Sequence, residues 1–272
     1  MAALTTTNPV VAVWPEGVMP GHGAEGPEML SSPEKTDTRR ITNISHPTLT
    51  LFSVPATNAP APFVLVCPGG GYNYVTYDKE GVEIAGWLNS NGISAAVLKY
   101  RTPRNREGAF QDVQRSLSLA RARAAEWNID PYHIGIIGFS AGGNLSAKAS
   151  TRFNLRSYTP MDNVDQQSCR PDFAILVYPA YLANTNGQLS ADLPITANIP
   201  PTLIVHDEDD PTTNFVTGSK LYDAALTKAQ VPHQFLLYAT GGHGYGLHCA
   251  KDAKAWPQAA VGWLKANKVI SN

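Results

Sequence analysis

The stretch Gly138-Phe139-Ser140-Ala141-Gly142 limits the possible folds of this chain more than any other feature. It follows the apolar run at residues 134–137 and precedes a helix-compatible run at residues 144–149. A serine between two glycines at such a junction is typical of a nucleophile elbow, a turn so tight that only glycine fits on either side. The pattern predicts a strand, a sharp turn that exposes the Ser140 hydroxyl, and a helix. A packing turn without chemistry is the alternative.

The composition of the 272-residue chain favours a sizeable core and argues against charged partners. Hydrophobic residues make up 43% of the chain, and its formal net charge is −1. A nearly neutral chain lacks the basic excess that nucleic acids attract, and no apolar run reaches the ~20 residues of a membrane span. We therefore expect neither nucleic acid nor a membrane as a partner. No signal peptide is recognisable, and the compartment stays open. The sequence also leaves the oligomeric state open.

Short apolar strands alternate with helices along most of the sequence. We expect strands at residues 40–45, 48–54, 63–67, 93–100, 134–137, 173–178, 202–206 and 235–238, and helices at residues 81–91, 110–127, 144–149, 215–229 and 253–267. This alternation predicts an α/β fold with a mostly parallel sheet that is covered by helices on both faces. We expect an irregular lead-in over residues 1–38 and a single domain over residues 39–272.

Three cysteines occur, at positions 67, 169 and 249, and none is spaced as in a metal or redox motif. Cys67 ends an apolar strand and is expected to be a small buried side chain. The sequence leaves a Cys169–Cys249 disulfide open.

A serine hydroxyl needs a base to become a good nucleophile, and His243 is the best candidate among seven histidines. It lies in Gly241-Gly242-His243-Gly244-Tyr245-Gly246, just after the last predicted strand. Glycines in this position let the imidazole approach other parts of the backbone. His206 ends a strand and is expected to make a structural hydrogen bond, whereas His248 is a candidate binding residue. A flexible turn that happens to hold a histidine is the alternative for His243.

A histidine base needs a carboxylate to orient it and to stabilise its protonated form. The segment His206-Asp207-Glu208-Asp209-Asp210-Pro211 follows a predicted strand and lies between Ser140 and His243 in the chain. Its four acids all remain candidates at this point. The two alternatives are an acidic surface loop without a catalytic role and a divalent-cation site, because clustered carboxylates suit hard cations. Consecutive carboxylates point in different directions and the spacing is not that of a calcium-binding loop, so we expect no metal.

An acyl-transfer transition state places negative charge on the carbonyl oxygen, which backbone N–H groups can stabilise. Pro68-Gly69-Gly70-Gly71-Tyr72 follows the strand at residues 63–67 and lets amides approach a substrate with no side chain in between. We expect the oxyanion donors to be the amides of Gly70, Gly71 and Ala141, the last being the residue after the serine.

These blocks together resemble those of the α/β-hydrolase-fold esterases. They are Cys67-Pro68-Gly69-Gly70-Gly71-Tyr72, Gly138-Phe139-Ser140-Ala141-Gly142-Gly143, the acidic segment and the glycine-rich histidine segment. The chain is most similar to the acetyl xylan esterase-like and feruloyl esterase-like carbohydrate esterases over about residues 40–266. Further shared-looking pieces are Glu80-Gly81, Tyr100-Arg101, Asp112-Val113-Gln114-Arg115 and Arg170-Pro171-Asp172-Phe173.

The resemblance implies a triad of Ser140, His243 and Asp210. In this family the strand-end histidine is followed by a small residue, two variable positions and the acid, a pattern that selects Asp210 and leaves Asp209 second. Asp207 here replaces the small residue, and Asn144 stands where a histidine is frequent. Asn144 and Tyr72 are candidate substrate-binding residues. The implied activity is cofactor-free hydrolysis of short acyl esters, such as acetyl groups on sugars.

Other functions share parts of this pattern. A serine peptidase of the prolyl-oligopeptidase type has the same elbow and triad order, and a general short-chain esterase has no carbohydrate role. A non-catalytic binding protein of the same fold typically lacks a triad member. Residues 152–170 and 181–199 could form a cap, but neither reads as a large hydrophobic lid. Five tyrosines could stack on sugar rings, namely Tyr72, Tyr74, Tyr77, Tyr181 and Tyr245.

Overall fold

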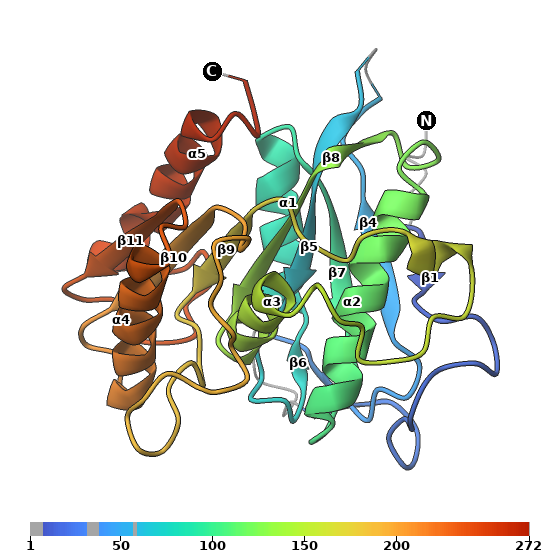
Figure 1. Ribbon diagram of the computed structural model, residues 1–272, viewed down its shortest axis with the longest axis horizontal. Helices are drawn as coiled ribbons and strands as arrows, with labels where there is room; N and C mark the ends of the chain where they lie inside the picture. The colour runs from blue at the N-terminus through green and yellow to red at the C-terminus, as the bar shows by residue number, and fades with distance from the viewer. Residues whose placement is uncertain (1–7, 32–37, 57–58, 272) are drawn as a thin grey trace, which may run out of the picture.

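The computed structural model describes residues 8–31, 38–56 and 59–271 (Figure 1). Within these residues, one eight-stranded sheet runs through the centre of the molecule. Its strands in spatial order are β1 (Val10–Ala12), β4 (Thr48–Phe52), β7 (Ser94–Lys99), β5 (Ala61–Cys67), β8 (Ile129–Phe139), β9 (Ala174–Val177), β10 (Thr202–Asp207) and β11 (His233–Tyr238). β4 pairs antiparallel with β1 and β7, and the remaining neighbours are parallel. The predicted mostly parallel sheet is confirmed.

Helices cover both faces of this sheet. One face carries α1 (Glu83–Ser90), which continues a π-helical turn η1 (Asp78–Val82), and α5 (Trp256–Ala266), which follows the short η3 (Asp252–Ala255). The other face carries α2 (Arg106–Ala122), α3 (Ala141–Thr151) and α4 (Thr213–Lys228), which stand in front of the sheet in Figure 1. A further short helix is η2 (Asn163–Gln166). None of the helices in the described ranges is long and apolar enough to cross a membrane.

The strand β5 shows why the sequence forms this layered core. Val64 and Val66 pack with α1 and α5, whereas Phe63 and Leu65 pack with α2 and α3. Successive side chains of a strand point to opposite faces, so a continuous apolar run requires a cover on both sides. The α/β architecture therefore follows directly from the runs seen in the sequence.

The expected irregular lead-in over residues 1–38 is wrong at two short segments, which form strands. Val10–Ala12 forms the edge strand β1 of the main sheet, and Met29–Leu30 forms β2 in a small sheet with β3 (Arg40–Thr42) and β6 (Val75–Thr76). Residues 1–7 and 32–37 lie outside the described residues. Strands this short carry little periodic signal, and pairing with distant segments stabilises them.

The bounds of two expected elements need correction. The helix expected at residues 110–127 begins earlier, at Arg106, because the Asn105 side chain caps it by accepting a hydrogen bond from the Gly108 amide at 2.8 Å, and it ends at Ala122. The strand expected at residues 134–137 begins earlier, at Ile129. Cys169 and Cys249, whose pairing the sequence left open, are free thiols, and Cys67 is buried as expected.

The parallel strands place the sequence blocks at one edge of the sheet. The glycine segment follows β5, Ser140 follows β8, the acidic segment follows β10 and the histidine segment follows β11. Because carboxyl ends of parallel strands share an edge, these four loops meet, at the lower edge in Figure 1.

Candidate active site

Ser140 occupies the turn between β8 and α3 in a strained conformation. Its φ and ψ are 52° and −116°, outside the regions that L-residues commonly adopt. A side chain on Gly142 would overlap the carbonyl of Cys67 in the neighbouring strand β5, so only glycine permits this approach. The amides of Asn144 and Ala180 donate to the Ser140 carbonyl and hold the turn. The expected elbow geometry is therefore present.

Ser140, His243 and Asp210 form a continuous hydrogen-bond series. The Ser140 Oγ lies 2.8 Å from His243 Nε2, and His243 Nδ1 lies 2.7 Å from Asp210 Oδ2. The His243 side chain is 22% exposed and the Asp210 side chain is fully buried. The series runs from a partly accessible hydroxyl to a carboxylate sealed from water, as general-base activation of a hydroxyl requires.

Asp210 is held as a carboxylate by several donors. Its oxygens also contact His206 Nε2 at 3.1 Å and the Thr212 amide at 2.8 Å. Burial alone would raise the pKa of Asp210, but hydrogen bonds with His206, His243 and Thr212 hold it well below its usual range. The buried His206 also bonds the Ser219 hydroxyl at 2.7 Å, and burial lowers its pKa despite the neighbouring carboxylate. Its expected structural hydrogen bond is confirmed.

The other three acids of the segment point elsewhere. Glu208 pairs with Lys220 at the surface. Asp209 accepts hydrogen bonds from the amides of Gly241 and Gly242 at 2.7 Å each and pairs with Lys251. Within the described ranges, no three His, Cys, Asp or Glu side chains are grouped as metal ligands. The carboxyl groups of Glu208 and Asp209 therefore do not share a ligand position, and Asp209 instead holds the histidine loop.

Asp207 is buried and contacts the histidine loop. Its Oδ2 accepts a hydrogen bond from the Tyr245 hydroxyl at 2.8 Å, while its buried Oδ1 has no partner among the described residues. Burial raises the pKa of Asp207 to about 6, against the effect of the Tyr245 hydrogen bond. A side chain on Gly241 would overlap this carboxyl group, so the position of Asp207 requires glycine at residue 241.

The glycine segment after β5 lies against the serine. A side chain on Gly69 would come within 2.9 Å of Ser140 Cβ, which shows how closely the two loops approach. In the part of the chain that is described, the amides of Gly70, Gly71 and Ala141 donate no hydrogen bond to protein. Three available amides beside a serine hydroxyl are what an oxyanion needs.

Sequence reasoning did not identify the role of Glu80, which connects the glycine and histidine loops. This residue is 3% exposed and accepts hydrogen bonds from the Gly69 amide at 2.8 Å and from the Tyr178 hydroxyl at 2.9 Å. The same Tyr178 hydroxyl accepts the Gly246 amide at 2.9 Å. Burial raises the pKa of Glu80, and the hydrogen bonds oppose that rise. The only sequence signal for this residue is the pair Glu80-Gly81, which resembles the esterase family.

Tyr72 and Asn144 form part of the wall beside the serine. The Tyr72 hydroxyl donates to Asn144 Oδ1 at 2.7 Å, and Asn144 Nδ2 donates to the Tyr181 carbonyl. Both side chains are at most 3% exposed. Tyr72 is therefore no open platform for a sugar ring, because Arg106 lies over its ring and Asn144 occupies its hydroxyl. His248, the other candidate binding residue, is exposed and bonds Glu83.

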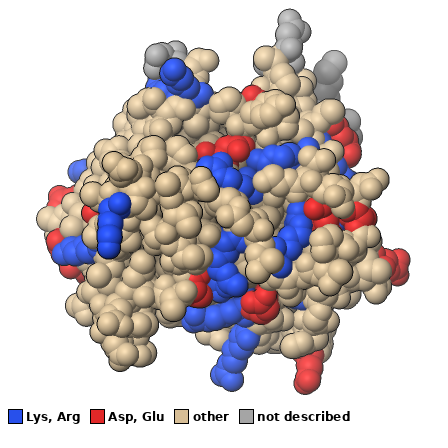
Figure 2. Space-filling view, in the orientation of Figure 1, with Lys and Arg blue, Asp and Glu red and all other residues tan. Residues whose placement is uncertain are grey.

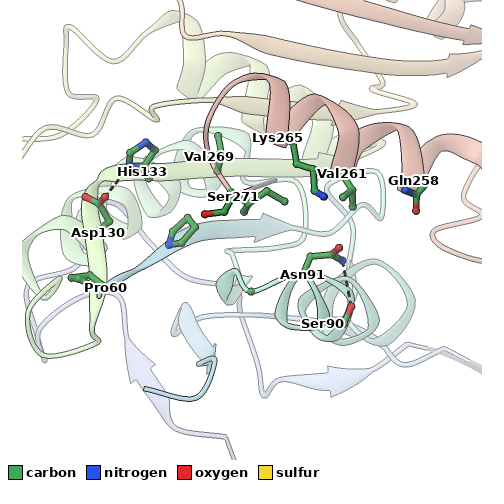
Figure 3. A pocket seen from close by; sticks show the side chains of 13 residues that line it. Pro60, Ser90, Asn91, Asp130, His133, Gln258, Val261, Lys265, Val269 and Ser271 are labelled. Atoms are coloured by element: carbon green, nitrogen blue, oxygen red, sulfur yellow. Dashed lines mark hydrogen bonds and ion pairs between the residues drawn. The ribbon is translucent and has the colours of Figure 1, made fainter. Parts of the chain in front are cut away.

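A cavity of about 780 Å³ lies at the opposite edge of the sheet (Figure 3). Asp130 and His133 of β8, Asn91 after α1 and Lys265 of α5 contribute to its lining. His133 Nδ1 contacts Asp130 Oδ2 at 2.8 Å. None of the candidate catalytic residues lines this cavity, so it is separate from the site built around Ser140.

Known esterases are similar to this chain in sequence and in fold. Residues 49–177 match the BD-FAE family. An acetylxylan esterase of Xylanibacter ruminicola is 30% identical over 204 residues, which are 66% of this chain and 40% of that protein. An endo-1,4-beta-xylanase B of Butyrivibrio fibrisolvens is 28% identical over 66% of this chain and 32% of that protein. The chain thus spans less than half the length of these two relatives.

A solved structure matches the whole chain. The acetyl ester-xyloside bifunctional hydrolase from Caldicellulosiruptor lactoaceticus superposes with a TM-score of 0.77 at 26% identity, covering 99% of this chain and 100% of that one. An esterase of Thermogutta terrifontis, Est2, has a TM-score of 0.71 at 21% identity over 93% of this chain and 95% of its own, which shows the shared fold. The layered sheet, the elbow and these similarities show that the chain has the α/β-hydrolase fold, and the proteins that it resembles are named as esterases, among them an acetylxylan esterase.

Proposed function

We propose that this protein is a serine carboxylesterase that removes short acyl groups, acetyl above all, from carbohydrate alcohols through an acyl-enzyme. The observation that carries the proposal is the series Ser140–His243–Asp210, with contacts of 2.8 and 2.7 Å, beside the glycine segment after β5. Relatives named for acetylxylan esterase and acetyl ester-xyloside hydrolase activity support the substrate class.

In the acylation step, His243 Nε2 takes the Ser140 proton as Oγ attacks the ester carbonyl carbon. The resulting oxyanion accepts hydrogen bonds from the amides of Gly70, Gly71 and Ala141. Asp210 stays ionised and stabilises the protonated imidazole, which suits its lowered pKa. When the tetrahedral intermediate collapses, His243 gives the proton to the departing alcohol oxygen, and the acyl group remains on Ser140.

In the deacylation step, water takes the place of the alcohol. His243 removes a proton from water as its oxygen attacks the acyl carbon, and the second tetrahedral intermediate uses the same amides. Its collapse returns the proton from His243 to Ser140 Oγ and releases the carboxylic acid. No group other than these residues is needed to balance the two half-reactions.

Tyr72 and Asn144 support a preference for short acyl groups. They fill the wall beside Ser140 with buried, mutually bonded side chains, so the acyl group meets a polar surface rather than a long apolar channel. Each methylene that finds an apolar pocket is worth about 0.8 kcal/mol of transfer free energy, so a deep channel would make the rate rise with chain length. We expect the opposite trend.

The test uses nitrophenyl esters of increasing acyl length, acetylated xylo-oligosaccharides and a fluorophosphonate probe. We expect the highest kcat/KM at acetyl, release of acetate from the oligosaccharides, and loss of both activity and labelling in Ser140→Ala, whose rate should fall by several orders of magnitude. A maximum at eight or more acyl carbons contradicts the acyl preference. Full labelling of Ser140→Ala contradicts the nucleophile.

A further inference from the structure

Arg106 lies against two tyrosine rings, Tyr72 and Tyr181, which also contact each other at 6.3 Å between their centres. It is the first residue of α2 and is exposed. Its guanidinium carbon lies 4.7 Å from the centre of the Tyr72 ring and 4.4 Å from the centre of the Tyr181 ring. Two aromatic faces attract the cation and restrict its motion, while the N–H groups at the guanidinium edge are left for other partners.

The two rings connect Arg106 to the reacting groups. Tyr72 directly follows the oxyanion candidate Gly71, and a side chain on Gly71 would lie 3.7 Å from the Tyr181 hydroxyl. The Tyr181 ring contacts Phe215 at 5.3 Å between centres, and Phe215 contacts His243 at 5.6 Å. The guanidinium is therefore separated by one tyrosine ring from the glycine loop that holds the candidate oxyanion donors.

The charge of Arg106 is not neutralised by a partner. In the described part of the chain, it makes no ion pair and no hydrogen bond, whereas the neighbouring Arg101 and Arg115 are buried and paired with aspartates. Glu107 follows it in α2, but consecutive helix positions face different directions.

The nearby carboxylate of Asp192 is paired with a cation other than Arg106. The carboxyl group of Asp192, whose charge reaches Tyr72, lies 3.0 Å from Lys148. Burial alone would raise the pKa of Asp192, but hydrogen bonds from Ser190 and Lys148 and the charge of Arg152 hold it below its usual value. Figure 2 shows Lys and Arg side chains gathered on the lower middle of this face, with acidic side chains beside them.

We propose that Arg106 binds a carboxylate on the alcohol part of the substrate, so that the preferred esters are acylated acidic sugars. This inference rests on the proposed function and names the substrate class of the same site. A guanidinium presents paired N–H donors in the geometry of a carboxylate, and its contacts with the Tyr72 and Tyr181 rings restrict its position before the substrate arrives. An uncompensated cation beside a hydrolase site also raises the local concentration of anionic substrates, an effect that salt weakens.

The experiment compares ester pairs that differ only in a carboxylate. One pair is mono-O-acetylated methyl glucuronoside and methyl glucoside, and a shorter pair is 4-acetoxybenzoate and 4-acetoxybenzamide. Each is assayed with the wild type, Arg106→Gln and Arg106→Lys. Arg123→Gln serves as the matched control, because it removes one charge at the far end of the same helix, from a half-exposed side chain.

We expect Arg106→Gln to lower kcat/KM about tenfold for the anionic member of at least one pair and to leave the neutral member within about twofold. Arg106→Lys should retain part of the preference, since it keeps the charge without the planar donors. The wild-type preference should shrink with added salt, and Arg123→Gln should match the wild type.

Two results overturn the inference. If Arg106→Gln lowers kcat/KM equally for anionic and neutral esters, Arg106 supports the position of Tyr72 and Tyr181 rather than binding a carboxylate. If kcat/KM stays at the wild-type value for both members of both pairs, Arg106 has no role in recognition. Activity of the wild type on the neutral esters keeps the proposed esterase function intact in either case. Absence of all ester hydrolysis by the wild type would refute the proposed function itself, and this inference with it.

Discussion

At the residue scale, Asp210 differs from its acidic neighbours in what it contacts. It bonds two histidines and an amide, whereas Asp209 bonds two glycine amides and Glu208 reaches a surface lysine. We expect Asp210→Asn to lower kcat by about 10⁴, because an amide cannot stabilise protonated His243 and favours the wrong tautomer. Asp209→Asn should cost far less, and Glu208→Gln almost nothing. The check is kcat on one acetyl ester, and a larger loss in Asp209→Asn would move the assignment.

Asp207 should make the stability of the protein depend on pH. Its folded-state pKa of about 6 lies above the ordinary value of 3.8, so the fold prefers the protonated form. The resulting penalty is absent below about pH 4, grows as pH rises to about 6 and is constant above that. Asp207→Asn should therefore raise the free energy of unfolding by up to about 3 kcal/mol at pH 8 and by almost nothing at pH 4. Urea unfolding at both pH values measures this, with Glu208→Gln as control, and a pH-independent difference would contradict it.

At the element scale, the segment from η1 into α1 connects two loops that bear on the chemistry. Lys79 Nζ donates to the Gly244 carbonyl at 3.0 Å, Glu80 joins Gly69 to Tyr178, and Glu83 of α1 pairs with His248. The glycine loop and the histidine loop thus share one support. Their relative position sets where the oxyanion donors lie with respect to the base.

We expect Glu80→Gln to act on kcat rather than on KM. Glutamine presents an N–H₂ group to one of two donors, so either the Gly69 amide or the Tyr178 hydroxyl loses its acceptor. Small misplacement of oxyanion donors costs roughly 10- to 100-fold in rate, while ground-state binding changes little. The measurement is kcat and KM on acetyl esters, with affinity for a boronic acid transition-state mimic. Glu126→Gln, at a side chain that is 63% exposed, is the surface control. A rise in KM at constant kcat would place Glu80 in substrate binding instead.

At the scale of the whole molecule, the N-terminal segment belongs to the core. Trp14, two residues beyond β1, is 6% exposed, and its indole Nε1 donates to Asp112 Oδ1 at 2.7 Å. Asp112 also forms a buried ion pair with Arg101, and Trp14 packs edge-on against Tyr158. This contact joins a segment that reads as a loop in sequence to the central helix α2.

Trp14→Ala should destabilise the protein by about 3–5 kcal/mol, because it opens a large cavity and removes a donor from a buried carboxylate. Trp14→Phe should cost less, since it keeps most of the packing. Denaturant unfolding measures both, and Val10→Ala, at a side chain that is 63% exposed, is the matched control. The kcat of the folded variants should stay near that of the wild type. A stability loss no larger than that of Val10→Ala would show that the segment is dispensable.

The sequence by itself determined the features that depend on neighbouring residues. The period-two and continuous apolar runs produced the strands, and the glycine pattern around Ser140 indicated the elbow. Gly242 and Gly244 beside His243 have positive φ, which glycine adopts without strain. The chain order of the loops was also sufficient to bring them to one sheet edge, because parallel strands end on the same side. The choice of Asp210 came from resemblance, since four adjacent carboxylates look alike in sequence.

Only the tertiary structure decided which side chains meet across long stretches of chain. Glu80 and Tyr178 are 98 residues apart, Tyr72 and Asn144 are 72 apart, and neither pair leaves a local pattern. Edge strand β1 depends on pairing with β4, and its own three residues carry too little signal to predict it. The burial or exposure of a side chain likewise appears only in the fold, because it depends on what packs against it from elsewhere in the chain. Tyr72 is buried beside Asn144, burial raises the pKa of Asp207, and Arg106 stays exposed beside two tyrosine rings.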